Sequence, residues 1–220
     1  MIYLSGAISK EIDRRAHAKL GFLITPWGGN NPPPNRAWAA DNGCFTRPMP
    51  ERDSPRWQAF VRRLQSVPGC LFLPAPDVWG NWQATLQLWR TGGRSRIVET
   101  GVPVAIVLQD GATTDEVPWD EIDAVFLGGS DAWRPKAVPI LQQAKRYGKH
   151  VHIGRVNTWR GLMFSRQAGA DTVDGTHLAY SPGASLTRLN SWLSRLDAQM
   201  PLPLPVDAIR QPSAFRVGQS

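Results

Sequence analysis

Eight short apolar runs, separated by stretches with helical patterning, constrain the fold of this chain more than any other feature. The runs occupy residues 2–4, 22–25, 37–40, 71–73, 104–108, 124–127, 151–153 and 172–173. Amphipathic patterns typical of helices cover residues 10–20, 55–65, 82–90, 135–147, 159–167 and 184–196. Strands that alternate with helices are typical of a parallel sheet.

Eight strands in this order predict an α/β fold, a compact single-domain (β/α)8 TIM barrel. We expect the barrel to occupy residues 1–200, and residues 201–220 to form a proline-rich tail. A doubly wound open sheet is the alternative. The Pro/Gly/Asn-rich stretch 25–36 is predicted to be a loop at the rim of the site.

The charge of the chain favours a polyanionic partner. The net charge is +7, and 20 of the 25 basic residues are arginine, whose planar fork matches phosphate. A genome rich in G and C explains the arginine count equally well without such a partner. Most of the ten tryptophans are expected to pack helices onto the sheet, and one or two could stack on bases.

The sequence predicts a cytoplasmic protein with no membrane association. No run approaches the roughly 18 apolar residues of a membrane span. The N-terminal MIYLSGAIS passes directly into the charged KEIDRR, so it is predicted to be the first strand rather than a signal peptide. Cys44 and Cys70 are too few for a disulfide framework or a zinc cluster, and no metal site is expected.

Polar residues and glycines follow six of the predicted strands. In a barrel, such positions gather at the end where catalytic groups lie. In chain order they are Asp41-Asn42-Gly43, Asp77, Gln109-Asp110-Gly111, Gly128-Gly129-Ser130, Gly154-Arg155 with Asn157, and Asp174-Gly175. Each fragment alone is also ordinary turn chemistry, and Asn-Gly is a hairpin signal. Together they predict a pocket that reads a polar heterocycle by hydrogen bonds.

These fragments resemble, in the same order, the motifs of the queuine and archaeosine tRNA-guanine transglycosylases. "DNGCF" is similar to the family's Asp-Ser-Gly-Gly-Phe/Tyr, "APD" to its later aspartate and "LQDG" to its Gln-Gly stretch. "LGGS" resembles its Gly-Gly-Leu, "HIGRVNT" its Met-Gly-Val-Gly-Thr and "VDGT" its nucleophile segment. The resemblance covers residues 37–177. In size the chain looks most like the 7-deazaguanine DNA transglycosylases of bacteria and phages.

The resemblance implies two catalytic carboxylates and no cofactor. Asp174 would be the nucleophile that attacks C1′ of the target nucleotide and forms a covalent glycosyl-enzyme. Asp41 would be the general acid/base that deprotonates the incoming base. Two displacements at C1′ retain its configuration, as in retaining glycosidases.

The resemblance also implies a base-binding set and contacts with the nucleic acid. The base-binding residues would be Asn42, Phe45, Asp77, Gln109, Gly128, Gly129 and Ile153, of which Phe45 and Ile153 would sandwich the ring. Arg155 and Arg160 are expected to contact the backbone phosphates. The target base would have to leave its stack, as enzymes that act on bases require.

The chain departs from the family in three places. It cannot build the Cys-x-Cys-x-x-Cys…His zinc site of the tRNA enzymes, which favours DNA over tRNA as substrate. Cys44 and Asn42 replace a glycine and a serine, so the selected base can differ. Asp110 adds a carboxylate beside Gln109, and we expect it to be a turn residue rather than a base acceptor.

The histidines form no metal spacing. His150 and His152 lie on one face of a strand, and we expect them to be structural. His177, three residues after Asp174, is a better candidate than either of them for orienting the site.

The predicted function is exchange of guanine in DNA for a 7-deazaguanine such as preQ0, with DNA and the free base as partners. Three alternatives to this function remain: an RNA substrate, a nucleoside 2-deoxyribosyltransferase, and a non-catalytic nucleic-acid-binding subunit. The deoxyribosyltransferase is suggested by MIYLSGAIS and implies an open α/β fold and a glutamate nucleophile. For the assembly, a homodimer is left open.

Overall fold

The computed structural model describes residues 1–6, 9–28, 31, 35–44, 55–65, 67–179 and 182–198 of the 220-residue chain. The predicted tail 201–220 and the predicted base-stacking residue Phe45 lie outside these ranges.

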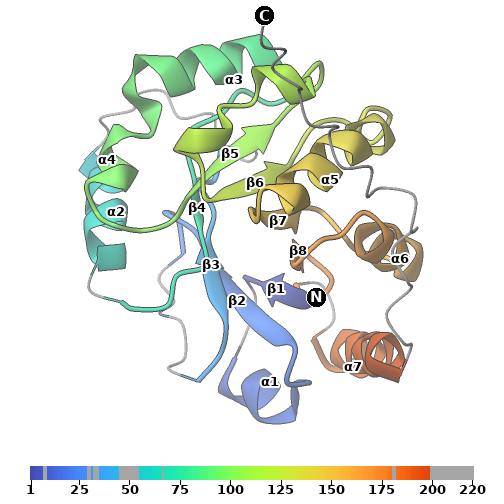
Figure 1. Cartoon of the computed structure of the whole chain (residues 1–220). Coiled ribbons are helices and arrows are strands. Elements are labelled where there is room, and N and C mark those ends of the chain that lie inside the picture. The colour runs from blue at the N-terminus through green and yellow to red at the C-terminus, as the bar shows by residue number, and fades with distance from the viewer. Residues whose placement is uncertain are drawn as a thin grey trace, which may run out of the picture.

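Eight parallel strands follow one another around a barrel, with helices outside them (Figure 1). The strands are β1 (Ile2–Ser5), β2 (Leu20–Ile24), β3 (Trp38–Ala40), β4 (Leu73–Pro74), β5 (Val104–Leu108), β6 (Ala124–Leu127), β7 (His150–Ile153) and β8 (Thr172–Asp174). Their order in the sheet is β3-β2-β1-β8-β7-β6-β5-β4.

The two end strands of this order, β3 and β4, are joined just before β4 begins. Leu71 N–H donates to the Trp38 carbonyl (2.9 Å) and Ala40 N–H donates to the Phe72 carbonyl (3.0 Å). Trp38 and Cys70 form an isolated parallel bridge at the same place. The ring of strands is therefore a (β/α)8 TIM barrel. The alternative of a doubly wound open sheet is wrong.

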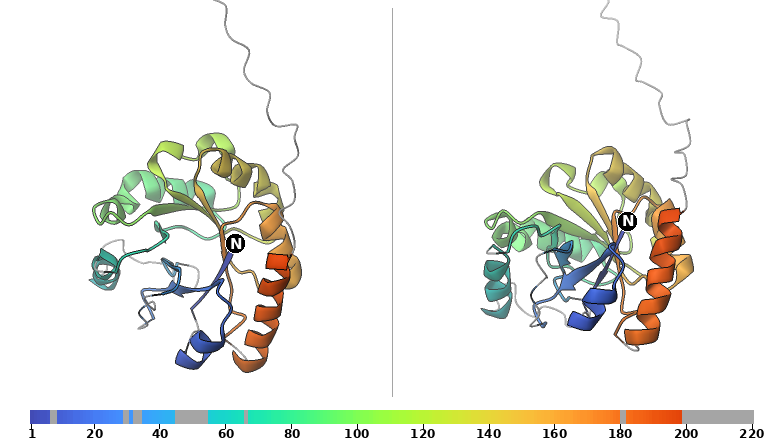
Figure 2. Two further views of the ribbon diagram at one scale, coloured as in Figure 1. Left: turned by 60° about the horizontal axis from the view of Figure 1, so that its bottom comes forward. Right: turned by 90° about the horizontal axis from the view of Figure 1, so that it is seen from below.

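Seven α-helices in the described ranges cover the outside of the strands (Figures 1 and 2). They are α1 (Lys10–Arg15), α2 (Pro55–Gln65), α3 (Trp82–Leu88), α4 (Ser95–Val98), α5 (Val138–Arg146), α6 (Trp159–Gln167) and α7 (Pro182–Ala198). Side-chain oxygens of Ser9, Asn81 and Thr158 cap the N-termini of α1, α3 and α6. Within the described ranges, no helix has both the length and the apolar character to cross a membrane.

The helix predicted over residues 10–20 is shorter than expected. It ends at Arg15, and Leu20 begins β2 instead, where it pairs with Tyr3 of β1. The spacing of Ile12 and Leu20 would place both on one face of a helix. Leu20 is instead buried as a residue of β2, which lies between β1 and β3 in the sheet. Tertiary pairing has overridden local periodicity here.

Alternation along the strands decides which side chains face the barrel interior. An inner cluster of buried side chains fills the barrel: Leu4, Leu23, Ala39, Phe72, Ala105 and Ala124. The intervening residues, such as Tyr3 and Ile153, belong to the larger core between strands and helices. Inward-facing positions further along each strand reach the C-terminal end of the barrel, where the site lies.

Candidate functional site

A cavity of about 520 Å³ opens at the C-terminal ends of the strands. We call it the central cavity. Its volume lies in the range of pockets for small ligands. Several residues singled out in the sequence line it: Asp41, Asn42, Asp77, Gln109, Gly128, Arg155 and Asp174. The barrel thus brings together side chains that are up to 133 positions apart in the chain (174 minus 41).

Asp41 leaves β3 through two consecutive side-chain turns. Its Oδ1 accepts the Gly43 N–H (3.1 Å), and Asn42 Oδ1 accepts the Cys44 N–H (2.9 Å). Gly43 has φ 75°, and a Cβ there would lie 2.7 Å from Trp27 Nε1. Asn42-Gly43 is therefore a turn at the end of a strand. A glycine at position 43 permits both the positive φ and the close approach of the Trp27 side chain.

The carboxyl of Asp41 titrates near neutrality. Burial raises its pKa to about 7, and the charges of Asp174 and Asp77 add to the increase, while the Gly43 N–H opposes it. The side chain is only partly exposed, at the cavity wall. A carboxyl with this pKa can both give and take a proton at neutral pH.

Asp77 lies at the centre of a hydrogen-bond network. Asn42 Nδ2 donates to its Oδ1 (2.8 Å), and Gln109 Nε2 donates to its Oδ2 (2.6 Å). Burial raises the pKa of Asp77, and hydrogen bonds from Asn42, Gln109 and the Cys44 side chain oppose that rise. These donors fix Asp77 as an acceptor in the cavity wall. No role could be assigned to Cys44 from the sequence motif. In the structure, its side chain is one of the groups that hydrogen-bond to Asp77.

Gln109 also holds two loops of the barrel rim. Its Oε1 accepts the N–H of Gly80 (2.9 Å) and of Gly129 (3.0 Å), so both ends of the amide are engaged with protein. The N–H of Gly129, a predicted base-binding residue, therefore already has Gln109 as its acceptor. The adjacent Asp110 accepts from the Ser130 backbone N–H (2.6 Å) and hydroxyl (2.5 Å).

Asp174 ends β8 and its carboxyl group reaches the central cavity. His152, fully buried on the neighbouring β7, lies with Nε2 at 3.0 Å from Asp174 Oδ1. Gly154 leaves room for the carboxylate, because a Cβ there would lie 3.1 Å from Asp174 Oδ1 and 2.9 Å from Phe126. The carboxylate is thus held between an imidazole and a glycine.

Two predicted residues do not reach the site. The Ile153 side chain is fully buried in the outer core and does not line the cavity, because strand alternation turns His152 inward instead. The prediction that Ile153 sandwiches a base is therefore wrong. The His177 ring packs on Trp192 at 4.9 Å between centroids, rather than on Asp174.

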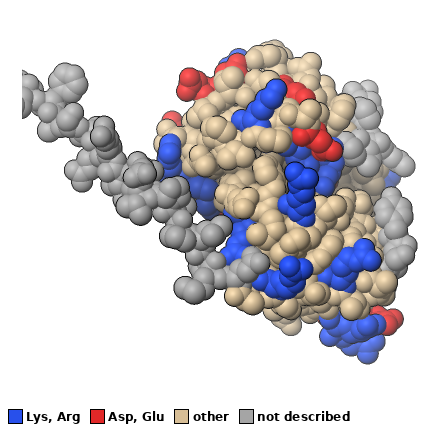
Figure 3. All heavy atoms as spheres, turned by 90° about the vertical axis from the view of Figure 1, so that its right-hand side faces the viewer, with Lys and Arg blue, Asp and Glu red and all other residues tan. Residues whose placement is uncertain are grey.

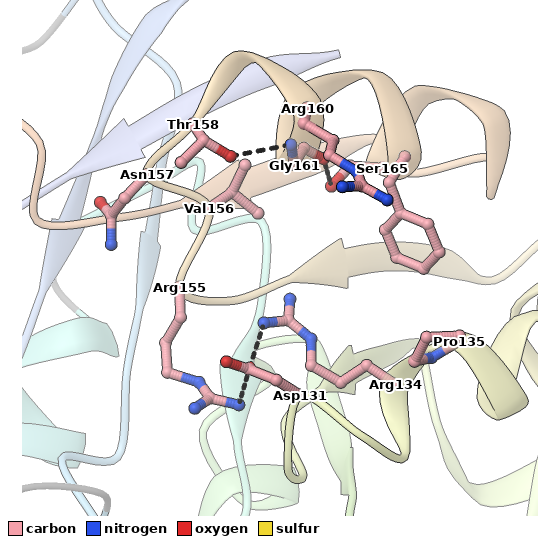
Figure 4. Close-up of a pocket in the computed structure, with 11 residues that line it drawn as sticks. Asp131, Arg134, Pro135, Arg155, Val156, Asn157, Thr158, Arg160, Gly161 and Ser165 are labelled. Atoms are coloured by element: carbon pink, nitrogen blue, oxygen red, sulfur yellow. Dashed lines mark hydrogen bonds and ion pairs between the residues drawn. The ribbon is translucent and has the colours of Figure 1, made fainter.

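A second cavity of about 600 Å³ lies beside the first, between the loops after β6 and β7 (Figure 4). We call it the arginine cavity, because Arg134, Arg155 and Arg160 line it. Figure 4 shows Arg134 and Arg155 directed toward Asp131, each with a nitrogen 3.6 Å from its Oδ1. Asp131 is largely exposed, and Arg160 stands on the first turn of α6. Positive charge gathers here beside the central cavity.

Arg155 connects the two cavities and contributes to the lining of both. It is the one non-glycine residue with positive φ (57°) in the described ranges, and its guanidinium donates to the Gly129 carbonyl. Arg134 donates to the Gly154 carbonyl, and its pKa is lowered by burial and by the charge of Arg155. Positive φ is uncommon in non-glycine residues and clusters at active sites and ligand clamps, so Arg155 is a candidate binding residue.

Sequence reasoning missed four residues of the site: His152, Cys44, Arg134 and Trp79. Trp79, with 53% of its surface exposed, lines the central cavity and can offer a stacking surface. It follows the "APD" segment by two residues, so its position was visible in the sequence. For His152, the alternation of β7 was the available signal.

The described residues contain no group of three or more His, Cys, Asp or Glu side chains that could hold a metal ion. The chemistry that this arrangement can perform is that of paired carboxylates beside a hydrogen-bonding wall. No family model and no curated protein matches the chain, so this geometry and the sequence motifs are the basis for any function assigned to it.

Proposed function

We propose that the protein is a base-exchanging transglycosylase that replaces guanine in DNA with a 7-deazaguanine base. The observation that carries the proposal is a pair of carboxylates, Asp41 and Asp174, in one cavity but in different surroundings. Asp41 has a pKa of about 7, and Asp174 is held by the His152 imidazole. Paired carboxylates with distinct environments are typical of acid/base and nucleophile roles at a glycosidic bond.

The exchange runs in two displacements at C1′. The Asp174 carboxylate attacks C1′, the bond from C1′ to the purine nitrogen breaks, and protonated Asp41 delivers its proton to the leaving base. The incoming base then loses a proton to the Asp41 carboxylate, and its nitrogen attacks C1′ and releases Asp174. Both carboxyls return to their starting states, so no further reactant is needed.

The side of the central cavity formed by Asp77 matches the hydrogen-bonding edge of a guanine-like base. A guanine or 7-deazaguanine presents a ring N–H and an amino group, which are donors, side by side. Asp77 is fixed by Asn42 and Gln109 as an acceptor that lines the cavity. Trp79 supplies an aromatic surface at the same cavity. A carboxylate acceptor favours such a base over one whose corresponding edge carries only acceptors.

The arginine cavity supports a phosphate-bearing substrate over a free nucleoside. It adjoins the central cavity through Arg155, which lines both cavities. Basic side chains also predominate over acidic ones on the face that Figure 3 turns to the viewer, the side of the molecule with α6 and α7 in Figure 1. Together with the net charge of +7, these features favour a nucleic acid.

The deoxyribosyltransferase alternative loses its structural basis. It implied an open α/β sheet that begins with MIYLSGAIS, whereas this segment supplies β1 of a barrel, between β2 and β8. An RNA substrate and a non-catalytic binding subunit remain alternatives for experiment.

The test is incorporation of labelled guanine or preQ0 into duplex DNA, with single-stranded DNA, tRNA and free deoxyguanosine as parallel substrates. We expect label in DNA, together with a protein–DNA adduct that survives a denaturing gel. Label in tRNA alone would assign the RNA alternative. Salt-sensitive DNA binding without label or adduct would assign a binding subunit, and turnover of deoxyguanosine alone would refute the proposal.

Alanine in place of Arg160 is expected to weaken DNA binding and to reduce its salt dependence. Arg160 is exposed at the arginine cavity, and each lost phosphate contact lowers the slope of log K against log salt by about 0.9 for duplex DNA. The matched control is Arg146→Ala, an exposed arginine at the C-terminal end of α5 that hydrogen-bonds only to Gln143 among the described residues. Equal slopes for the two variants would remove Arg160 from the interface.

A further inference from the structure

A row of polar side chains crosses the barrel interior beneath the central cavity. His150 and His152 face inward from β7, and Thr172 and Asp174 face inward from β8, with His152 paired to Thr172 in the strand register. The His152 ring lies between Phe72 and Phe126, at 4.8 and 4.4 Å between ring centroids. Barrel interiors usually carry branched apolar residues at such positions, so this row is an exception.

Hydrogen bonds join the four side chains into one chain. The distance from His150 Nε2 to Thr172 Oγ1 is 2.8 Å, and that from Thr172 Oγ1 to His152 Nδ1 is also 2.8 Å. His152 Nε2 then lies 3.0 Å from Asp174 Oδ1. His152 is fully buried, so water has no access to either of its ring nitrogens.

For a neutral His152 beside an ionised Asp174, the chemistry of the groups fixes the direction of these bonds. An ionised Asp174 has only acceptors, so His152 Nε2 must carry the hydrogen. In a neutral imidazole the other nitrogen, Nδ1, is then an acceptor, and the Thr172 hydroxyl donates to it. The Thr172 oxygen is left to accept from His150 Nε2–H. Every donor in the chain points toward Asp174.

The surroundings keep the outer histidine neutral. The pKa of His150 is lowered to about 4, mainly by burial and also by the nearby His152 and Lys145, against the raising effect of Asp171. Phe72 of the segment before β4 also packs on the His150 ring, at 5.4 Å between centroids. A neutral His150 with a hydrogen on Nε2 is the donor that the chain requires.

The two oxygens of Asp174 are therefore not equivalent. Oδ1 accepts from His152, whereas Oδ2 has no hydrogen-bond partner in the part of the chain that the structure describes. The carboxyl group as a whole lines the central cavity. One oxygen is anchored inside the barrel and the other is available for a reacting atom.

We propose that His152 is a positioning residue for Asp174, and that Thr172 and His150 hold it in the donor tautomer. The inference rests on the proposed function, in which Asp174 is the nucleophile. The fixed N–H sets the orientation of the carboxylate for attack through Oδ2. It also stabilises the negative charge that returns to the carboxylate when the glycosyl group leaves, which favours breakdown of the covalent intermediate.

The test compares three variants in the exchange assay with DNA. His152→Phe keeps an aromatic ring between Phe72 and Phe126 but removes the donor, and we expect kcat to fall 10- to 100-fold with KM for DNA little changed. His152→Gln places an amide donor near the former Nε2 and is expected to recover most of kcat. Thr172→Val keeps the shape and removes the hydroxyl, so a smaller loss is expected.

A control separates positioning from loss of stability. Val151→Ala lies on the same strand but faces the outer core, and we expect it to lower the melting temperature without changing kcat of the folded protein. A His152→Phe variant with wild-type kcat, or a Gln variant no better than the Phe variant, overturns the inference. The proposed function would survive that result, because it is tested by label incorporation into DNA and by the Asp174 adduct, and neither requires His152 as a donor.

Nitrogen NMR of histidine-labelled protein provides a readout that does not require activity. We expect both His150 and His152 to carry hydrogen on Nε2, and Asp174→Ala to shift the His152 resonance more than that of His17, which lies outside the barrel interior. Hydrogen on Nδ1 of His152 would overturn the proposed direction of the chain, whatever the outcome of the exchange assay.

Discussion

Asparagine in place of Asp174 is expected to abolish the covalent protein–DNA adduct and to lower base exchange by roughly 10⁴-fold or more, as for removal of other enzyme nucleophiles. Asparagine has the size of aspartate and keeps an oxygen that can accept from His152 Nε2. The change therefore removes the nucleophilic charge while leaving the buried histidine with a partner. DNA binding is expected to stay within a few-fold of the wild type.

The measurement combines a denaturing gel for the adduct with single-turnover exchange rates. Asp171→Asn is the matched control. Asp171 is a carboxylate just before β8, at the opposite end of the barrel, where it pairs with Lys145. It should form the adduct at the wild-type rate. An Asp174→Asn protein that still forms the adduct would show that another residue attacks C1′, and the assignment of Asp174 would fail.

Asparagine in place of Asp41 is expected to stop exchange and, at the same time, to stabilise the fold above neutral pH. The pKa of Asp41 is about 7 in the folded chain, compared with the ordinary value of 3.8. Between these pH values the unfolded chain loses this proton before the folded chain does. The folded wild type therefore loses stability as pH rises from about 4 to 7, by up to about 4 kcal/mol for a shift of about 3 pKa units.

The asparagine side chain introduced by Asp41→Asn has no charge to bury and keeps an oxygen for the Gly43 N–H. Urea denaturation of both proteins at pH 4 and at pH 8 measures the effect. The difference in the free energy of unfolding should be small at pH 4 and reach its maximum, in favour of the variant, at pH 8. A difference that is the same at both pH values would show that Asp41 is not held as a high-pKa acid in the folded chain.

The Asp41→Asn variant is expected to lose activity and gain stability for one physical reason. A site that performs acid/base chemistry near neutral pH needs a carboxyl in surroundings that oppose its charge, and such surroundings destabilise the folded state. The buried carboxylate of Asp41 therefore lowers the stability of the folded chain above neutral pH, and the rest of the barrel supplies the stability that offsets this loss. A structural aspartate such as Asp171, paired with Lys145 and bonded to the Val151 N–H, shows the contrary arrangement.

The sequence by itself determined the eight parallel strands and most of the residues that line the central cavity. Eight apolar runs predict eight strands because parallel strands are buried on both faces and so read as continuous apolar segments. Asp41, Asp77, Gln109 and Asp174 could be found because parallel strands all end on the same side of a barrel, so that a polar residue after a strand belongs to the site.

Only the tertiary structure decided which way the side chains point. The sequence offered Ile153 as the ring-stacking residue, but the register of β7 turns it outward and places His152 inside, against Asp174. It offered residues 10–20 as one helix, but pairing with β1 draws Leu20 into a strand. A shift of one residue in register moves every side chain of a strand to the opposite face. Because both faces of a barrel strand are apolar, the sequence pattern does not specify which residues face inward.

The network that supports the site also depended on the tertiary structure. Cys44, Asn42 and Gln109 come from two different loops, and the closed barrel brings all three to Asp77. Sequence alone identified the carboxylates because their type and position suffice to mark them. It could not identify what holds them, because hydrogen bonds between residues tens of positions apart are set by the closure of the barrel and by the pleat of each strand.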